Sequence, residues 1–181
     1  MMEENVDFKY LELKKKDSGY EYVSRKIGNR GAVVIIPYSY RDKGNIKLVT
    51  IFSERPTFSK PILEFPAGLL DIEDESIENA ALRELYEETG YRGKVTRTYQ
   101  EYPSSAGLTD EVLYIVCVDI GKEIFKKPDS QRLDGSEKIT VNKPMTPSDL
   151  YFKYVNNEKY MVSSRMLTFL LGNLMNLKQE V

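Results

Sequence analysis

Three glutamates close together on one short stretch, Glu84, Glu87 and Glu88, are the residues best suited to chemistry. If the stretch is helical, Glu84 and Glu88 lie one turn apart on the same face, with Glu87 beside them. Carboxylates crowded in this way repel one another, but they suit a hard divalent cation, which prefers oxygen ligands. A solvated acidic helix is the ordinary alternative. The metal site is favoured because Arg83 can pair with Glu87 and Gly90 closes the stretch.

The wider stretch resembles the Nudix box, whose usual form is Gly, five residues, Glu, seven residues, Arg-Glu, an apolar residue, any residue, Glu-Glu, any residue, Gly, apolar. From its second fixed position onward the chain matches throughout, at Glu75, Arg83, Glu84, Leu85, Glu87, Glu88, Gly90 and Tyr91. Six residues separate Gly68 from Glu75, so we expect one extra residue bulging in the loop. Asp74 would restore the loop spacing but would put the Arg-Glu pair one residue out.

A broader resemblance, over residues 53–71, is to the ADP-ribose (ADP-sugar) pyrophosphatase subfamily. There an arginine precedes a Glu-Phe-Pro-Ala-Gly segment at about the spacing found here. Arg55 then corresponds to the arginine that contacts the diphosphate. An arginine can bind two diphosphate oxygens at once, which supports that role. The alternative is a surface ion pair with Glu54 or Glu64.

Two later loops extend this resemblance. Residues 102–111 are similar to the subfamily's Ser-Pro-Gly-Leu-Ser/Thr-Asp-Glu loop, which implies substrate contacts from Gly107 and Leu108, although Ala106 replaces a marker proline. Residues 133–139 resemble a mobile acidic loop that brings a further glutamate to the metal centre. Glu137 is the best match for that glutamate and Asp134 the second, with a solvated spacer loop as the alternative.

The start of the chain reads as a β-hairpin, residues 1–27, preceding a Nudix domain at residues 28–181. In the subfamily this hairpin crosses to the other subunit of a homodimer, and nearby aromatic residues clamp the adenine. Tyr20 is the first candidate for that stacking contact. Arg25 could reach a phosphate or the other subunit. The alternative is that alternating tyrosines simply pack on the sheet.

The order of elements predicts an α+β fold. Strands are expected at residues 32–36, 47–52, 94–101, 111–120 and 137–141. Ser76 and Gly90 are the expected ends of the carboxylate helix, and Thr146-Pro147 is expected to open a second helix. A last helix from about Ser163 is expected to bury Leu167, Leu170, Leu171 and Leu174. This order agrees with what the resemblance implies, a Nudix α/β/α sandwich around a mixed sheet.

Composition narrows the chemistry further. The chain has 181 residues, 41% hydrophobic and 30% charged, with a net charge of −2, so we expect one soluble domain without nucleic-acid or membrane partners. It has no histidine, which excludes a Ser-His-Asp triad, a Cys-His dyad and a histidine-based zinc site. The single cysteine, Cys117, lies in an apolar run and should be a buried strand thiol. We expect a cytoplasmic protein.

The resemblance implies hydrolysis of ADP-ribose, or a close ADP-sugar, to AMP and a sugar phosphate, with Mg²⁺ as cofactor and Mn²⁺ as a possible substitute. It makes Glu84 and Glu88 the central metal ligands, assisted by Glu87 and the Ala67 carbonyl. Glu137 would act as the base or orient the water. Two rival interpretations stay open: a Nudix hydrolase of another nucleoside diphosphate compound, and a catalytically inert module that senses a nucleotide.

Overall fold

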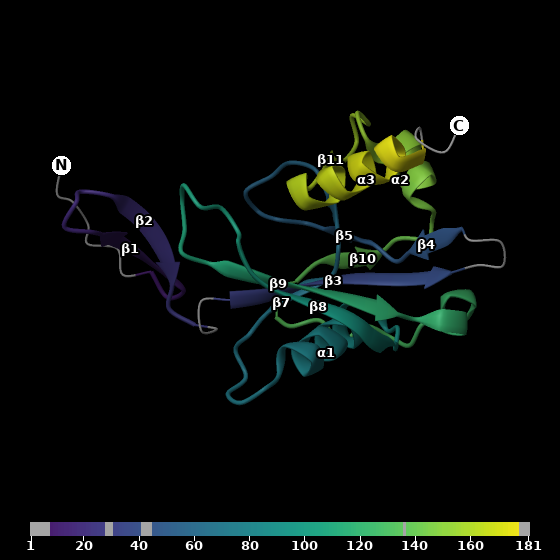
Figure 1. Ribbon diagram of the computed structural model, residues 1–181, viewed down its shortest axis with the longest axis horizontal. Helices are drawn as coiled ribbons and strands as arrows, with labels where there is room; N and C mark the ends of the chain where they lie inside the picture. The colour runs from purple at the N-terminus through teal and green to yellow at the C-terminus, as the bar shows by residue number, and fades with distance from the viewer. Residues whose placement is uncertain (1–7, 28–30, 41–44, 136, 178–181) are drawn as a thin grey trace.

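The computed structural model describes residues 8–27, 31–40, 45–135 and 137–177 (Figure 1). Its strands are β1 (Leu11–Lys15), β2 (Glu21–Arg25), β3 (Gly31–Tyr40), β4 (Ile46–Leu48), β5 (Ile51–Ser53), β6 (Ile62–Glu64), β7 (Ala67–Leu69), β8 (Lys94–Pro103), β9 (Val112–Asp119), β10 (Ile139–Val141) and β11 (Met161–Val162). The helices are α1 (Ile77–Thr89), the 3-10 helix η1 (Gly121–Phe125), α2 (Pro147–Tyr154) and α3 (Ser164–Leu177).

Strand β3 is the centre of the main sheet. It runs parallel to β9 along one edge and antiparallel to β7 and β4 along the other, and β8 continues the sheet beyond β9. Because successive side chains of a strand point to opposite faces, its apolar run serves two cores. Val33 and Ile35 belong to a core with α1, whereas Ala32 and Val34 belong to a core with α2 and α3.

Figure 1 shows the resulting layers, with α1 on one side of the sheet and α2 and α3 on the other. The expected α+β fold, an α/β/α sandwich around a mixed sheet, is therefore confirmed. Cys117 lies on β9, but its side chain is half-buried rather than fully buried.

The strand expected at residues 47–52 is in fact two strands in two different sheets. Strand β4 pairs with β3, whereas β5 joins a second sheet in the order β10-β5-β6-β11. The crossing residues Val49 and Thr50 are fully buried, and each makes a backbone hydrogen bond to another segment. The Val49 N–H donates to the Pro37 carbonyl at 3.0 Å, and the Thr50 carbonyl accepts from the Asn142 N–H at 2.8 Å. An apolar run alone could not reveal this change of sheet.

The predicted helix ends are confirmed. Ser76 caps α1 by accepting a hydrogen bond from the Asn79 N–H at 3.2 Å, and Gly90 ends it in the left-handed region at φ 71°. Thr146 caps α2 in the same way as Ser76 caps α1. The prediction that the leucines of α3 share one buried face is partly wrong, because Leu170 is buried but Leu171 is 41% exposed.

The hairpin β1–β2 forms a sheet of its own at one end of the molecule (Figure 1). Its link to the main domain is the 104–111 loop, where the Val23 N–H donates to the Leu108 carbonyl at 2.8 Å. The faces beyond this link are open, and Tyr10, Leu11 and Leu13 are 42% to 79% exposed. None of the helices within the described part of the chain is long and apolar enough to cross a membrane.

Candidate active site

Helix α1 presents its glutamates to strand β7. Ala81 and Leu85 are fully buried and fix the rotation of the helix against the sheet. On the adjoining face Glu88 is only 4% exposed, and its Oε2 accepts a hydrogen bond from the Ala67 N–H at 3.0 Å. A glutamate is rarely buried to this extent without a cation beside it. The sequence therefore places a costly carboxylate where the helix meets the sheet.

Gly68, the first residue of the Nudix-like pattern, leaves space for Glu84. A Cβ atom at Gly68 would lie 1.9 Å from Cδ of Glu84, much closer than any van der Waals contact. The Glu84 carboxylate thus rests against bare backbone of β7. No larger residue could stand at this position without moving that carboxylate.

Arg83 links the loop to the helix. Its Nε and Nη2 donate to the two carboxylate oxygens of Glu75 at 3.1 and 3.0 Å, a bidentate pair. Its Nη1 donates to Glu84 at 2.7 Å and to Glu87 at 3.1 Å. The predicted Arg83–Glu87 pair is present, but the hydrogen bond to Glu75 makes the largest contribution to the raised pKa of the guanidinium. This agrees with choosing Glu75 rather than Asp74 as the match to the pattern.

The extra loop residue is taken up locally. Asp74 adopts a positive φ of 59°, which is uncommon for a residue other than glycine and typical of a tight turn. Directly after it, the Glu75 N–H donates to the Ile72 carbonyl at 3.3 Å and its carboxylate faces Arg83. The loop therefore bulges without displacing the helix, as expected from the spacing.

Burial raises the pKa values of the two central carboxyls. Desolvation is the main cause for both, bringing the pKa of Glu84 to about 7 and that of Glu88 to about 8. The Arg83 charge opposes the rise at Glu84, and the Ala67 N–H opposes it at Glu88. The negative charge of Glu137 adds to both increases, so its carboxylate lies within electrostatic range of the helix.

These side chains share a cavity of about 320 Å³ with four arginines. Its lining includes Ala67, Glu84, Glu87, Glu88, Asp134, Glu137, Arg25, Arg55, Arg132 and Arg165. The structure thus brings together the predicted carboxylates, both predicted arginines and both acidic candidates of the 133–139 loop. Oxygen ligands beside guanidinium groups form a suitable environment for a metal-bound diphosphate.

The carboxylate and carbonyl oxygens at this site are the type of ligand that a hard divalent cation prefers, but the side chains do not yet converge on one point. Among the residues whose placement is described, no three acidic, cysteine or histidine side chains converge closely enough to hold a metal ion. The reason is visible in the contacts of Arg83, which draws Glu84 and Glu87 toward itself. Glu88 is buried and has no cationic partner within the described part of the chain, which is the strongest sign that a cation belongs here.

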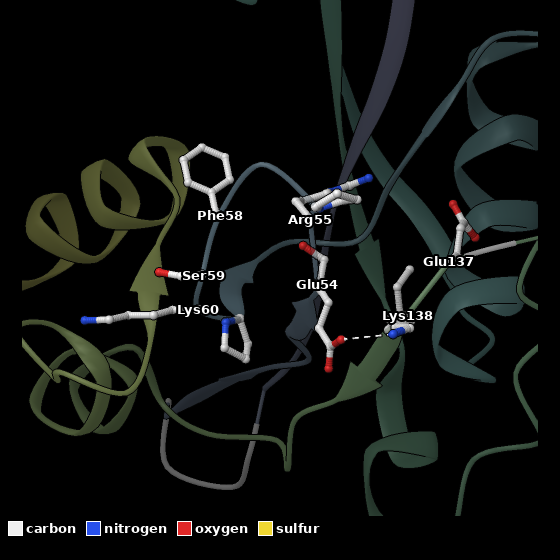
Figure 2. Close-up of a pocket in the computed structure, with 11 residues that line it drawn as sticks. Glu54, Arg55, Phe58, Ser59, Lys60, Glu137 and Lys138 are labelled. Atoms are coloured by element: carbon white, nitrogen blue, oxygen red, sulfur yellow. Dashed lines mark ion pairs between the residues drawn. The ribbon is translucent and has the colours of Figure 1, made fainter.

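Arg55 and Glu137 also line a second, adjoining cavity of about 690 Å³ (Figure 2). Arg55 lies 3.5 Å from Glu64, so the surface ion pair considered as its alternative does exist, yet its side chain is 53% exposed and lines both cavities. Glu64 itself is held by the Ser53 hydroxyl. Figure 2 also shows the Lys138–Glu54 ion pair, 3.7 Å long, in this second cavity.

Glu137 lies at the junction of the two cavities. Its carboxylate is exposed and accepts a hydrogen bond from the Asp134 N–H at 3.2 Å, while its own N–H donates to the Asp134 carbonyl at 3.0 Å. The two acidic candidates of the loop therefore belong to one turn. Of these two acidic residues, Glu137 lines both cavities and Asp134 lines the first one.

Of the two predicted hairpin residues, Arg25 lies at a cavity and Tyr20 does not. Arg25 reaches the first cavity, where it forms an ion pair with Glu111. Tyr20 is absent from the residues that line either cavity described here; it stacks with Tyr22 at 6.4 Å and donates to the Ala106 carbonyl at 3.2 Å. Gly107 and Leu108 also lie away from these cavities.

The sequence alone assigned no role to four cavity residues, Asp71, Glu111, Arg132 and Arg165, or to Glu64, which pairs with the cavity residue Arg55. Glu64 and Glu111 stand inside segments that carry the subfamily resemblance, and that position was a usable signal. Arg132 and Arg165 stand outside the segments that carry the resemblance. They reach the cavity only because the loop after η1 and the start of α3 fold back toward the main sheet.

Comparison with known proteins agrees with this architecture. A family model described as the NUDIX domain matches residues 28–163. An uncharacterized Nudix hydrolase of Schizosaccharomyces pombe is 35% identical, over 93% of this chain and 88% of its own. An ADP-ribose pyrophosphatase of Saccharomyces cerevisiae is 27% identical, over 96% of this chain and 81% of its own. A solved structure of an ADP compounds hydrolase, 21% identical, superposes with a TM-score of 0.60 over 94% of both chains, which supports the fold.

Proposed function

Since the chain belongs to the Nudix hydrolase family, we propose that it hydrolyses the diphosphate bond of ADP-ribose or a related ADP-sugar, releasing AMP and a sugar phosphate. The observation that carries the proposal is the shared cavity of Glu84, Glu87 and Glu88 with four arginines. A diphosphate needs both groups of residues, one to hold cations and one to bind its oxygens directly. The similarity to an ADP-ribose pyrophosphatase over most of both chains supports the choice of substrate.

Nudix hydrolases generally use divalent metal ions, and we assign Mg²⁺, with Mn²⁺ as a substitute, to this chain. The residues that would hold it are Glu84, Glu87, Glu88 and the Ala67 carbonyl. When bound, such an ion neutralises phosphate oxygens and lowers the pKa of a coordinated water. The chain's own part is to give up the Glu88 proton and to release Glu84 from Arg83, so binding should liberate protons near neutral pH.

The remaining roles fall to residues around the cavity. Arg55 binds the diphosphate, and Arg25 contacts a phosphate from the hairpin side. Glu137 accepts a proton from the attacking water or orients it, with Asp134 as the second candidate for that role. Glu87 and Glu88 would contribute to catalysis by holding the cation.

We place the adenine against Tyr20, with Gly107 and Leu108 forming the neighbouring loop. Because these three residues lie away from the cavities of a single chain, the assignment goes together with a homodimer in which the hairpin, residues 1–27, crosses with its open faces to the Nudix domain of the partner, residues 28–181, while Arg25 stays at the cavity of its own chain. The open faces of the hairpin support this arrangement, since Leu13 is 79% exposed and an isolated two-stranded hairpin is marginal in water. A cytoplasmic location completes the proposal.

The test is product analysis with a panel of nucleoside diphosphate sugars and Mg²⁺. Incubation with ADP-ribose, an ADP-hexose and a GDP-hexose, followed by chromatography of the products, should give AMP and a sugar phosphate fastest from an ADP-sugar. Preference for the GDP compound would assign the chain to another nucleoside. Tight binding of ADP-ribose without any product would identify an inert sensing module.

A further inference from the structure

The loop that carries Glu137 is fastened to the end of the carboxylate helix. The last turn of any α-helix leaves carbonyl groups without helical partners. Here the loop supplies the missing hydrogen-bond donors. The Arg132 N–H donates to the Glu87 carbonyl at 2.8 Å, and the Asp129 N–H donates to the Gly90 carbonyl at 3.2 Å. The Gln131 side-chain amide donates to the Glu88 carbonyl. Two of these acceptors belong to the residues that carry the active-site carboxylates.

Gly90 permits this attachment. A Cβ atom on Gly90 would lie 2.0 Å from the Asp129 carbonyl oxygen, so the loop backbone packs directly on the glycine. The Tyr86 hydroxyl donates to the Asp129 carboxylate at 3.1 Å, and the Arg132 guanidinium lies over the Tyr86 ring at 5.2 Å. The attachment therefore combines backbone, side-chain and ring contacts within four loop residues.

Gln131 connects the two ends of the loop. Its Nε2 donates both to the Glu88 carbonyl and, at 3.2 Å, to the carbonyl of Ile139, the first residue of β10. A primary amide has two N–H bonds, so both donors are used. Just before β10 the loop is also tied to the residue that follows β5, since the Glu54 N–H donates to the Lys138 carbonyl at 3.0 Å. Asp134 and Glu137 lie between these two anchors.

We infer that Gln131 is a positioning residue of the active site. By holding the Glu88 carbonyl and the Ile139 carbonyl with one amide, it fixes the position of the Glu137 turn relative to the carboxylate helix. The inference rests on the proposed role of Glu137, through which Gln131 acts. Misplacing a reacting group by about 1 Å can cost roughly a hundredfold in rate, so a loose loop should be visible in kcat.

The test replaces Gln131 by methionine, which keeps the length of the side chain but removes both donors. We expect kcat for ADP-ribose with Mg²⁺ to fall by ten- to a hundredfold, with KM changed less than about threefold. Gln131→Asn keeps an amide that is too short to reach both carbonyls and should give an intermediate loss, which covers the case that the methionine variant folds poorly. Gln100→Met, on the exposed part of β8, is the matched control and should leave kcat unchanged.

A double-mutant cycle with Glu137→Gln separates positioning from a purely structural role. If Gln131 acts through Glu137, Gln131→Met should lower kcat less than about twofold further in the Glu137→Gln background. Equal losses in both backgrounds, or a Glu137→Gln variant with unchanged kcat, would overturn the inference. Hydrogen exchange at the Arg132 amide should accelerate in Gln131→Met, and unchanged protection would contradict the attachment itself. That exchange result stands even if ADP-ribose proves not to be the substrate, so the two proposals can fail separately.

Discussion

Replacing Glu88 by glutamine should make the metal-free protein more stable while abolishing its activity. The carboxyl is 4% exposed, and burial brings its pKa from 4.5 to about 8. The folded protein therefore keeps a proton that the unfolded chain releases above pH 4.5. Unfolding free energy consequently falls as pH rises from 4.5 to 8, because the folded state binds more protons than the unfolded state.

The magnitude follows from the difference between the two pKa values. At about 1.4 kcal/mol for each pKa unit, the penalty for keeping Glu88 protonated in the folded protein reaches roughly 4 kcal/mol at pH 7.5. A glutamine avoids this penalty and can still accept the Ala67 N–H bond, but its own NH₂ group needs an acceptor. We expect about half of the penalty to be recovered, on the order of 2 kcal/mol, or about 6 °C in Tm for a chain of this length.

Thermal unfolding in EDTA at pH 5 and pH 7.5 measures this directly. The wild-type protein should be less stable at pH 7.5 than at pH 5, and the advantage of Glu88→Gln should appear at pH 7.5 and shrink at pH 5. Mg²⁺ should stabilise the wild-type protein at pH 7.5 by mass action and should have little effect on the variant. Glu87→Gln is the matched control: its side chain is 33% exposed and accepts from Arg83, so its loss should not stabilise the protein. A destabilised Glu88→Gln variant in EDTA would refute the reasoning.

Three further outcomes are expected. Arg55→Ala should raise KM for ADP-ribose about tenfold and lower kcat less, if its contact is already made in the ground state; an unchanged kcat/KM would leave Arg55 as a mere partner of Glu64. Gly68→Ala should lower kcat more than tenfold, because the new methyl group displaces Glu84, whereas Gly172→Ala, on the exposed side of α3 with open space around it, is the steric control and should leave kcat unchanged. Deleting residues 1–26 should give a monomer that no longer prefers adenine nucleotides, as light scattering after size exclusion and a substrate panel would show; an intact protein that is monomeric and fully active would contradict the dimer.

The local part of the site could be predicted from the sequence because it depends on spacing along one element. The carboxylate helix, its cap at Ser76 and its end at Gly90 follow from short-range geometry, and the structure has them where they were expected. Arg132 and Arg165 could not be found in this way. Their guanidinium groups reach the cavity through the path of a loop and the start of a distant helix, neither of which leaves a periodic signal.

The two glycines of the Nudix-like pattern, Gly68 and Gly90, each have a steric reason that the sequence alone does not show. A sequence explains Gly90 as a helix end, and its φ of 71° confirms that reason. The structure adds a second reason, because the Asp129 backbone occupies the place of a Cβ atom, and Gly68 shows the same relation to Glu84. One glycine thus admits a carboxylate to the helix–sheet junction, and the other admits the loop that brings Glu137 near it. A side chain at Gly68 would displace only the flexible Glu84 carboxylate, so that position should be sensitive in kcat before it is sensitive in stability. At Gly90 the positive φ and the backbone contact make any side chain costly to the fold itself.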